Sequence, residues 1–276
     1  MSGFETDFTV LIAVYRGDDP ALFAKAMTSV FANTLPPTRT VLVVDGPVPD
    51  ALDAVIGDFA TRDDLTVAQL PRNMGLAQAL NHGLDLITTS WTVRADADDI
   101  NDAGRFAALA DAIVKAQPDL AILGSAIKEV AQDGTVLAMR QPPLAHDAIR
   151  QFARRRNPFN HMTVAFRTDA AKRAGGYPDI HLKEDYALWA QMLANGAGAA
   201  NLPQSLVTAT TGRDMYNRRG GLRYARAEVQ LQMHLVRCGL KGRTSAVVDG
   251  LLRSAIFLAP TGLRALVYRK FLRHDA

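Results

Sequence analysis

Cysteine is nearly absent from this sequence of 276 residues: Cys238 stands alone, which excludes an intramolecular disulfide. The opening residues lack the basic and apolar regions that mark a signal peptide. Long apolar runs are also missing, because even residues 246–258 are interrupted by Asp249 and Arg253 before they reach the length of a membrane span. Together these absences predict a cytoplasmic protein.

A strong net charge is lacking as well, since the formal net charge is only +3. Neither a zinc-ligand spacing nor an aromatic and basic RNA motif is present, so no nucleic-acid partner is expected. The charge is nevertheless uneven: the first hundred residues are acidic, and arginine becomes frequent toward the C-terminus. This asymmetry predicts a basic face that suits phosphate groups or anionic lipid.

Apolar, β-branched runs alternate with stretches of helical spacing in the first part of the chain. The expected strands are residues 8–14, 40–44, 65–70 and 91–95, and the expected helices are residues 21–32, 51–60 and 76–87. Such alternation is typical of a mostly parallel sheet covered on both faces, with ligands at the carboxyl ends of its strands. The length favours one domain with an added tail.

The fourth expected strand ends in three closely spaced carboxylates. Alternation along an extended backbone puts Asp96 and Asp98 on one side and turns Asp99 to the other. Neighbouring carboxylates raise one another's pKa unless a cation neutralises them, and such hard oxygen ligands select Mg²⁺ or Mn²⁺. The alternative is a solvated turn that caps the next helix, with Asn101 or Asp102 as the N-cap.

Several segments resemble, in order and spacing, the signature of the family-2 glycosyltransferases, which are inverting enzymes that use sugar nucleotides. Those of the nucleotide-binding half are residues 10–15, 43–46, 73–81 and 94–99. Residues 175–177 and 184–189 resemble the family's acceptor loop and its Glu-Asp base motif. Residues 157–161 and 218–221 resemble bacterial members that build exopolysaccharide, amylovoran or O-antigen repeats.

The resemblance implies an α/β fold of the GT-A type, in which a Rossmann-like, mostly parallel central sheet is flanked by helices and followed by a C-terminal helical tail. It implies a catalytic domain at residues 1–240, with a nucleotide-binding half near 8–105 and an acceptor half near 106–240. Residues 241–276 would form the basic amphipathic tail.

The implied activity is metal-dependent, inverting transfer of a hexose from a nucleotide sugar, with UDP the expected nucleotide, in bacterial cell-surface polysaccharide biosynthesis. The acceptor would be a saccharide or a lipid-linked saccharide, and undecaprenyl diphosphate is one candidate carrier. A nucleotidyltransferase is an alternative, but it would need a glycine- and lysine-rich loop where residues 15–19 stand. A sugar-nucleotide-binding module without transferase activity is another.

The expected nucleotide-sugar contacts lie at strand ends, before the third helix and in an arginine-rich stretch. They are Ala13, Val14, Tyr15, Asp45, Arg72, Asn73, Gly75, Asp96, Arg213, Arg218 and Arg219. Structural alternatives are an Asp-Gly turn for Asp45, packing for Tyr15, a helix N-cap for Asn73 and a solvated turn for the arginines. The resemblance implies Asp98 and Asp96 as ligands of Mn²⁺ or Mg²⁺. Asp99 would orient the donor sugar or, with Arg105, cap the next helix.

The candidate catalytic residues are Asp185, as the base that takes the acceptor hydroxyl proton, and Glu184 in support. Both precede an expected amphipathic helix, residues 186–193, whose positive end also explains acidic residues structurally. Tyr177, Trp189 and His161 are candidate acceptor contacts, with packing or a structural hydrogen bond as the alternative.

The tail, residues 241–276, combines apolar side chains with arginines in a pattern that indicates basic amphipathic helices. Helices of this kind can lie on an anionic membrane surface, which would place the protein at the inner face of the cytoplasmic membrane. Packing against the catalytic domain, or against a second subunit of a homodimer, is the alternative.

Overall fold

A computed structural model describes residues 7–131, 133–210 and 221–258. The first part of the chain alternates as expected: β1 (Phe8–Val14), α1 (Pro20–Phe31), β2 (Arg39–Val44), α2 (Asp50–Ala60), β3 (Leu65–Gln69), α3 (Leu76–Leu86) and β4 (Trp91–Arg94). Next come β5 (Ile100–Asn101), α4 (Arg105–Lys115), β6 (Leu120–Val130), β7 (Val136–Arg140), α5 (His146–Phe152), the 3-10 turn η1 (His161–Thr163), β8 (Ala165–Arg167) and α6 (Thr168–Arg173). The last described elements are α7 (Glu184–Ala194), β9 (Gly198–Thr210), α9 (Leu222–Arg237) and α10 (Arg243–Leu258).

One mixed sheet runs through the described residues in the order β3-β2-β1-β4-β8-β6-β9-β5, with β7 paired to β6. The first four strands of this order are parallel to one another, and β8 enters antiparallel between β4 and β6. The carboxyl ends of β1, β2 and β4 therefore meet at one edge, where the expected nucleotide residues follow them.

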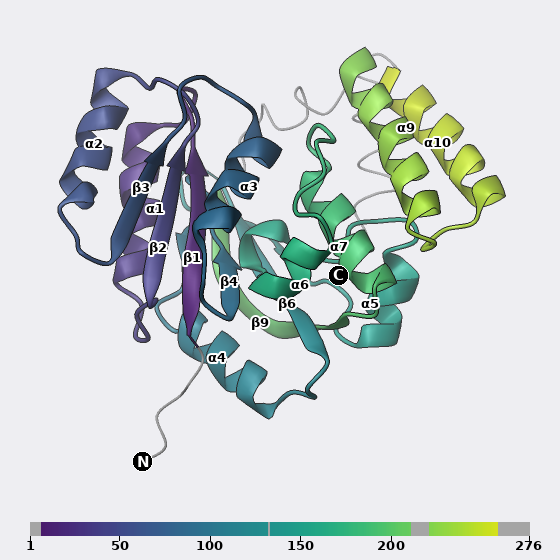
Figure 1. The fold of residues 1–276 in the computed structure, drawn as a ribbon, viewed down its shortest axis with the longest axis horizontal. Helices are drawn as coiled ribbons and strands as arrows, with labels where there is room; N and C mark the ends of the chain where they lie inside the picture. Colours follow the sequence, from purple (N-terminus) through teal and green to yellow (C-terminus); the bar gives the residue numbers. More distant parts are fainter. Residues whose placement is uncertain (1–6, 132, 211–220, 259–276) are drawn as a thin grey trace.

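The core has two layers, one on each face of this sheet. Leu11 of β1 packs in a cluster with α3, α7 and α9, whereas its neighbours Val10 and Ile12 pack in a cluster with α1, α2 and α4. This alternation follows from the two-residue period of a strand, and burial of both faces explains why every residue of β1 except Thr9 is apolar. Figure 1 shows α1 and α2 at one end of the molecule and the α9–α10 pair at the other.

A side-chain cap accounts for the start of α1. Asp19 begins α1 by accepting hydrogen bonds from the main-chain nitrogens of Ala21 (2.9 Å) and Leu22 (3.0 Å), with Pro20 in the first turn. The predicted N-cap of the helix after the carboxylates is wrong: Gly104 is the N-cap, and Asp102 instead accepts from the Gly104 nitrogen at 2.9 Å.

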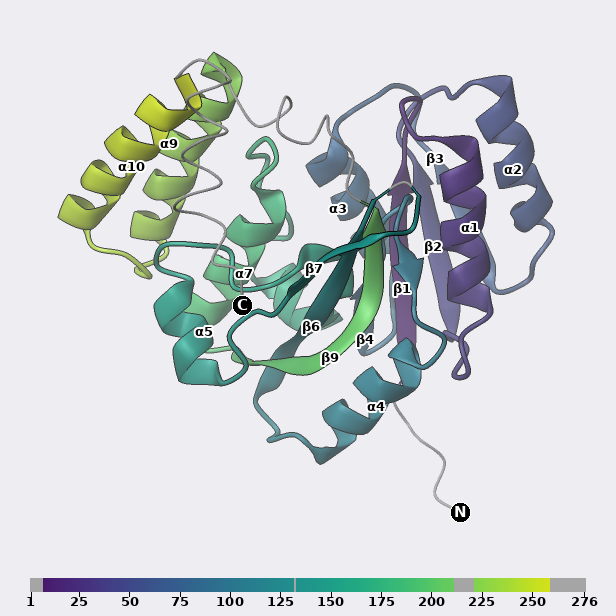
Figure 2. The ribbon, with the colours of Figure 1, turned by 180° about the vertical axis from the view of Figure 1, so that it is seen from behind.

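The expected amphipathic helix near residue 186 is also different in character. α7 begins at Glu184, and all of its residues except Gln191 and Ala194 are buried, so it is a core helix rather than an amphipathic one. It contacts α6 and α9, and the view from behind shows it between β6 and the α9–α10 pair (Figure 2).

The described part of the tail packs on the protein. The α10 helix lies along α9, and Lys241, just before α10, hydrogen-bonds Gln232 of α9 at 2.7 Å. α9 in turn contributes Leu231 and Leu235 to the main core. None of the helices that the structure describes is long and apolar enough to cross a lipid bilayer.

Candidate active site

The nucleotide edge of the sheet is built around Asp45, which directly follows β2. Its two carboxylate oxygens accept hydrogen bonds from the main-chain nitrogens of Met74 (2.6 Å) and Gly75 (2.9 Å), and its carbonyl accepts from the Asn73 side chain at 3.2 Å. Asp45 therefore holds the loop that leads into α3. Gly75, not Asn73, is the N-cap of α3, so the predicted N-cap alternative for Asn73 is wrong.

Gly46 makes this arrangement possible. Its φ of +85° is a conformation that L side chains rarely adopt, and a Cβ there would lie 2.4 Å from the Asn73 nitrogen. The neighbouring strand end carries Val14, which is buried, Ala13, which is partly buried, and Tyr15, which is exposed. Arg72 lies in the loop before α3, whereas Arg213, Arg218 and Arg219 lie outside the described residues.

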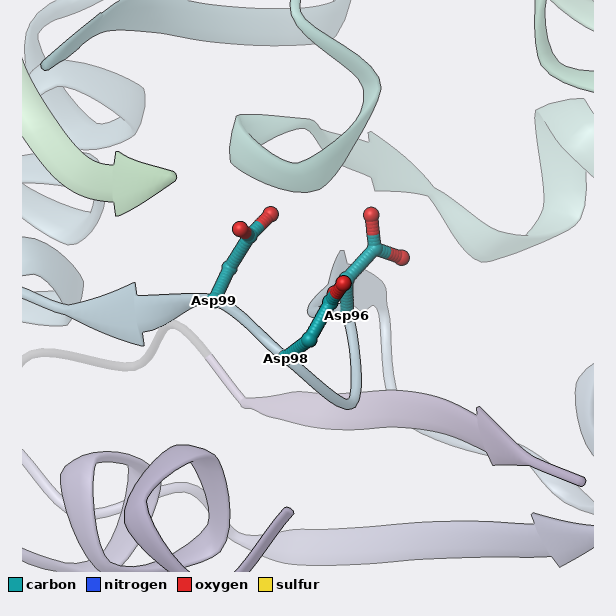
Figure 3. A group of neighbouring side chains, drawn as sticks. All are labelled: Asp96, Asp98 and Asp99. Carbon is teal, nitrogen blue, oxygen red and sulfur yellow. The ribbon is translucent and has the colours of Figure 1, made fainter. Parts of the chain in front are cut away.

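The three carboxylates after β4 form one cluster. A ligand oxygen from each of Asp96, Asp98 and Asp99 lies within 4.8 Å of the others, and Figure 3 shows the side chains rising on the same side of the chain. The prediction that Asp99 turns away is wrong, because β4 ends at Arg94 and the chain then turns, so strand alternation no longer applies. Asp99 thereby joins the candidate metal site.

Asp96 differs from the other two because it has cationic partners. It forms ion pairs with the buried Arg94 guanidinium and with His161, whose Nε2 lies 2.9 Å from Asp96 Oδ2. Burial alone would raise the pKa of Asp96, but these two cations outweigh it and hold the pKa below its ordinary value. Although burial opposes the charged ring, Asp96 and then Asp185 raise the pKa of His161 to about 9.

Asp98 and Asp99 carry the uncompensated charge of the cluster. Among the described residues neither forms an ion pair, and burial followed by the negative charge of Asp96 raises the pKa of both. A divalent cation would relieve this repulsion, and three clustered carboxylates are the hard oxygen donors that Mg²⁺ and Mn²⁺ prefer. The donor set thus fits a divalent metal.

Two buried arginines shape the turn, and they are residues whose roles the sequence did not predict. Arg94 donates to the carbonyl of Ala95, and Arg105 donates to the Asn101 side chain and, at 2.7 Å, to the carbonyl of Arg94. Arg105 does not cap α4 together with Asp99, since the N-cap is Gly104. A signal was available in Arg94, a charged residue that ends an otherwise uncharged and buried strand.

The acidic pair at the start of α7 belongs to the same electrostatic system. Asp185 is buried, and burial raises its pKa while the positive charges of His161 and Arg94 lower it. Burial and the neighbouring Asp185 raise the pKa of Glu184 to about 7. Asp185 Oδ1 has no hydrogen-bond partner within the described ranges, so it is free to accept a proton from a bound molecule.

The aromatic acceptor contacts predicted from the sequence are not at the surface. Tyr177 is 2% exposed and Trp189 is 0% exposed, and both rings pack with Phe166, at centroid distances of 6.4 and 5.3 Å. The prediction that these two rings contact an acceptor is therefore wrong, because they fill the core beneath α7. His161 keeps an exposed part of its side chain beside Asp96.

Comparison with known proteins agrees with this geometry. A family model described as glycosyl transferase family 2 matches residues 9–174. An Escherichia coli UDP-Gal:alpha-D-GlcNAc-diphosphoundecaprenol beta-1,3-galactosyltransferase is 34% identical over 99% of this chain and 99% of its own. The amylovoran biosynthesis glycosyltransferase AmsE of Erwinia amylovora is 35% identical over 95% of this chain and 98% of its own.

Solved structures support the fold. S. aureus TarS (residues 1–349) in complex with UDP-GlcNAc has a TM-score of 0.69 at 16% identity, covering 97% of this chain and 76% of the other. Mannosyltransferase PcManGT from Pyrobaculum calidifontis, in complex with GDP-Man and Mn²⁺, has a TM-score of 0.64 at 20% identity, covering 95% and 78%. These likenesses confirm the expected GT-A fold, and with the family match they identify the chain as a member of glycosyltransferase family 2.

Proposed function

We propose that this glycosyltransferase moves a hexose from a UDP-hexose to a saccharide carried on a polyprenyl diphosphate, in bacterial cell-surface polysaccharide synthesis, at the inner face of the cytoplasmic membrane. Support for the donor and the acceptor comes from the E. coli relative, whose name gives UDP-Gal and GlcNAc-diphosphoundecaprenol and which matches nearly the whole chain. The observation that carries the proposal is the pairing of the Asp96, Asp98 and Asp99 cluster with the acidic start of α7 through Arg94 and His161.

Asp98 and Asp99 are the proposed ligands of Mn²⁺ or Mg²⁺, while Asp96 is held by Arg94 and His161. When bound, the metal would neutralise the negative charge that develops on the diphosphate leaving group. The protein's own part at this edge is to keep two uncompensated carboxylates together at the end of a buried strand.

Asp185 is the proposed base. As the acceptor hydroxyl oxygen forms its bond to the anomeric carbon, the bond from that carbon to the UDP oxygen breaks on the opposite face, and the hydroxyl proton passes to Asp185. Configuration at the anomeric carbon inverts in this single displacement. Arg94 and His161 oppose the rise in the pKa of Asp185 that its burial causes, and Glu184 is the proposed supporting residue beside it at the start of α7.

Contact with a membrane surface is a further part of the proposal, because the acceptor would be lipid-linked. The α10 helix exposes a set of apolar side chains that α9 does not cover, namely Val247, Val248, Leu251, Leu252 and Leu258. Arg253 of the same helix donates to the carbonyl of Arg155, which places the Arg154–Arg156 run near this helix. Apolar and basic side chains together are suited to an anionic lipid surface.

The direct test is a donor and acceptor assay on the purified chain. UDP-galactose, UDP-glucose and UDP-N-acetylglucosamine are each incubated with a lipid-diphosphate-linked GlcNAc, with Mn²⁺ or with EDTA, and the product is analysed by NMR. We expect transfer with one UDP-hexose, dependence on the metal and inversion at the anomeric carbon. Retention of configuration, or full activity in EDTA, would contradict the mechanism.

A further inference from the structure

A buried carboxylate on α9, far along the chain from the site, has no role in the mechanism above. Glu228 is fully buried, and its Oε1 accepts a hydrogen bond from Gln232 at 2.8 Å and lies 3.5 Å from Arg253 Nη1. Its Oε2 accepts no hydrogen bond within the described residues but lies 3.3 Å from Lys183 Nζ. A buried charge of this kind depends on its partners, so Lys183 and Glu228 hold each other in place.

Lys183 links Glu228 to the acidic pair at the start of α7. It is the N-cap of α7 and directly precedes Glu184 and Asp185. Its ammonium group lies 4.5 Å from the centre of the Tyr224 ring of α9 and 5.6 Å from that of Phe257 of α10. The α9–α10 pair therefore surrounds the side chain that begins the base-bearing helix.

The backbone before Lys183 explains why such an anchor is needed. Leu182 has a φ of +56° and is the non-glycine residue with a positive φ among those the structure describes. Left-handed backbone is disfavoured for an L residue and persists where the surroundings enforce it. The Leu182 side chain is exposed, so its own packing does not enforce this conformation, whereas the neighbouring Lys183 is fixed on α9.

We propose that Glu228 is a positioning residue for the transfer step: through Lys183 it sets the strained entry into α7 and thereby the orientation of Asp185. This inference rests on the proposed role of Asp185 as the base. Loss of the Glu228–Lys183 pair would let the first turn of α7 relax, and a small displacement of a base lowers the rate of proton transfer more than it weakens donor binding. The nucleotide edge, built on Asp45 and the carboxylate cluster, would be unaffected.

A second ion pair in the same helix pair, in which Lys241 is buried and Asp249 is partly buried, provides a matched control. Lys241 Nζ contacts Asp249 Oδ2 at 2.5 Å and Gln232 Oε1 at 2.7 Å, so this pair also ties α9 to α10. Neither Lys241 nor Asp249 contacts α7 through a hydrogen bond or ion pair among the described residues. Asp249→Asn leaves in place Gln232, which accepts from Lys241 and donates to Glu228, so it should perturb the helix pair without releasing Lys183.

The experiment compares kcat and donor KM for transfer from UDP-galactose to lipid-diphosphate-linked GlcNAc in the full chain. Glu228→Gln and Lys183→Met should each lower kcat by about tenfold or more and change donor KM by less than about twofold. Lys183→Arg, which keeps the charge, should restore most of the rate. Asp249→Asn should lower the melting temperature yet keep kcat within about twofold of the wild type.

Unchanged kcat in Glu228→Gln, with or without a loss of stability, would overturn the proposal, as would equal losses of kcat in Glu228→Gln and Asp249→Asn. If Glu228→Gln does not fold, the comparison of Lys183→Met with Lys183→Arg decides, and equal rates in these two contradict the proposal. Asp185→Asn is assayed alongside. A fully active Asp185→Asn contradicts the base itself, whereas an inactive one beside an unaffected Glu228→Gln contradicts only the positioning role.

Discussion

His161 Nε2 lies 2.9 Å from Asp96 Oδ2, so one of the three clustered carboxylates is already neutralised by the protein. Arg94, which is buried, holds the other side of the same carboxylate. Because Asp96 has cationic partners and Asp98 has none among the described residues, substitutions at these two positions should affect protein stability differently. Asp96→Asn should cost about 3 kcal/mol of unfolding free energy, because it leaves the buried Arg94 without its ion pair. Chemical denaturation measures this loss.

Asp98→Asn is the matched comparison and should behave differently. The pKa of Asp98 is raised by burial and by Asp96, so the native structure disfavours its charge. Because the Asp98 side chain is exposed, solvent screens this effect, so its removal should change the unfolding free energy by less than about 0.5 kcal/mol, while transfer activity is lost. Equal destabilisation by the two substitutions would contradict the division of roles within the cluster.

The effect of metal on the melting temperature should test the proposed roles of Asp98 and Asp99 as its ligands. A ligand that binds only the native state raises its stability, by about 2.7 kcal/mol at a concentration one hundred times its dissociation constant. Mn²⁺ with UDP should therefore raise the melting temperature of the wild type, and EDTA should reverse the shift. Asp98→Asn and Asp99→Asn should each lose this response, and a full response in the double variant would place the metal elsewhere.

Asp185→Asn tests the base directly. The substitution keeps size and hydrogen-bonding capacity but cannot accept the acceptor proton, so transfer should fall by about two to four orders of magnitude. UDP and Mn²⁺ binding, measured by calorimetry, should stay within about twofold, since Asp185 is on α7 and not on the nucleotide edge. Wild-type transfer rates in Asp185→Asn would contradict the assignment of Asp185 as the base.

The pH dependence of the unfolding free energy should reveal the raised pKa of Glu184. Its ordinary value of 4.5 is raised to about 7 by burial and by Asp185. Because the folded protein holds this proton more tightly than the unfolded chain, the carboxyl favours folding most below pH 4.5, and this contribution is lost as the pH rises through 7. Glu184→Gln cannot ionise. It should exceed the wild type in unfolding free energy by about 3 kcal/mol near pH 8 and equal it near pH 4. A difference in unfolding free energy between Glu184→Gln and the wild type that stays constant from pH 4 to pH 8 would contradict the raised pKa of Glu184.

Vesicle sedimentation tests the exposed face of α10. Leu251 and Leu252 are 69% and 61% exposed, so the double change Leu251→Gln and Leu252→Gln should leave the fold intact. It should reduce co-sedimentation with vesicles of phosphatidylglycerol and phosphatidylcholine. Val114→Gln on α4 removes a comparably exposed apolar side chain, 60% exposed, away from the α9–α10 pair and serves as the control. Equal binding by all three proteins would exclude this surface.

The sequence was sufficient to predict the parallel half of the sheet, since β1 and β2 contain continuous apolar runs at residues 10–14 and 41–44. It also located the carboxylate cluster at the end of β4. The predicted direction of the Asp99 side chain was wrong, because side chains alternate between two faces only while the backbone stays extended. The predicted acceptor contact of Trp189 was also wrong, because α7 is buried on nearly all sides and its sequence pattern does not show this burial. The contact between Lys183 and Glu228 joins distant parts of the chain, and no local pattern indicates such a contact.

The close approach of Gly46 to Asn73 has a kinetic consequence. A Cβ at position 46 would lie 2.4 Å from the Asn73 nitrogen. The loop after β2 and the loop before α3 therefore pack directly against each other in the folded chain. This edge of the sheet is therefore ordered before any ligand arrives, and the proposed binding of a sugar nucleotide there would cost little free energy for loop ordering. The proposed association of the donor should consequently need no rearrangement of these two loops.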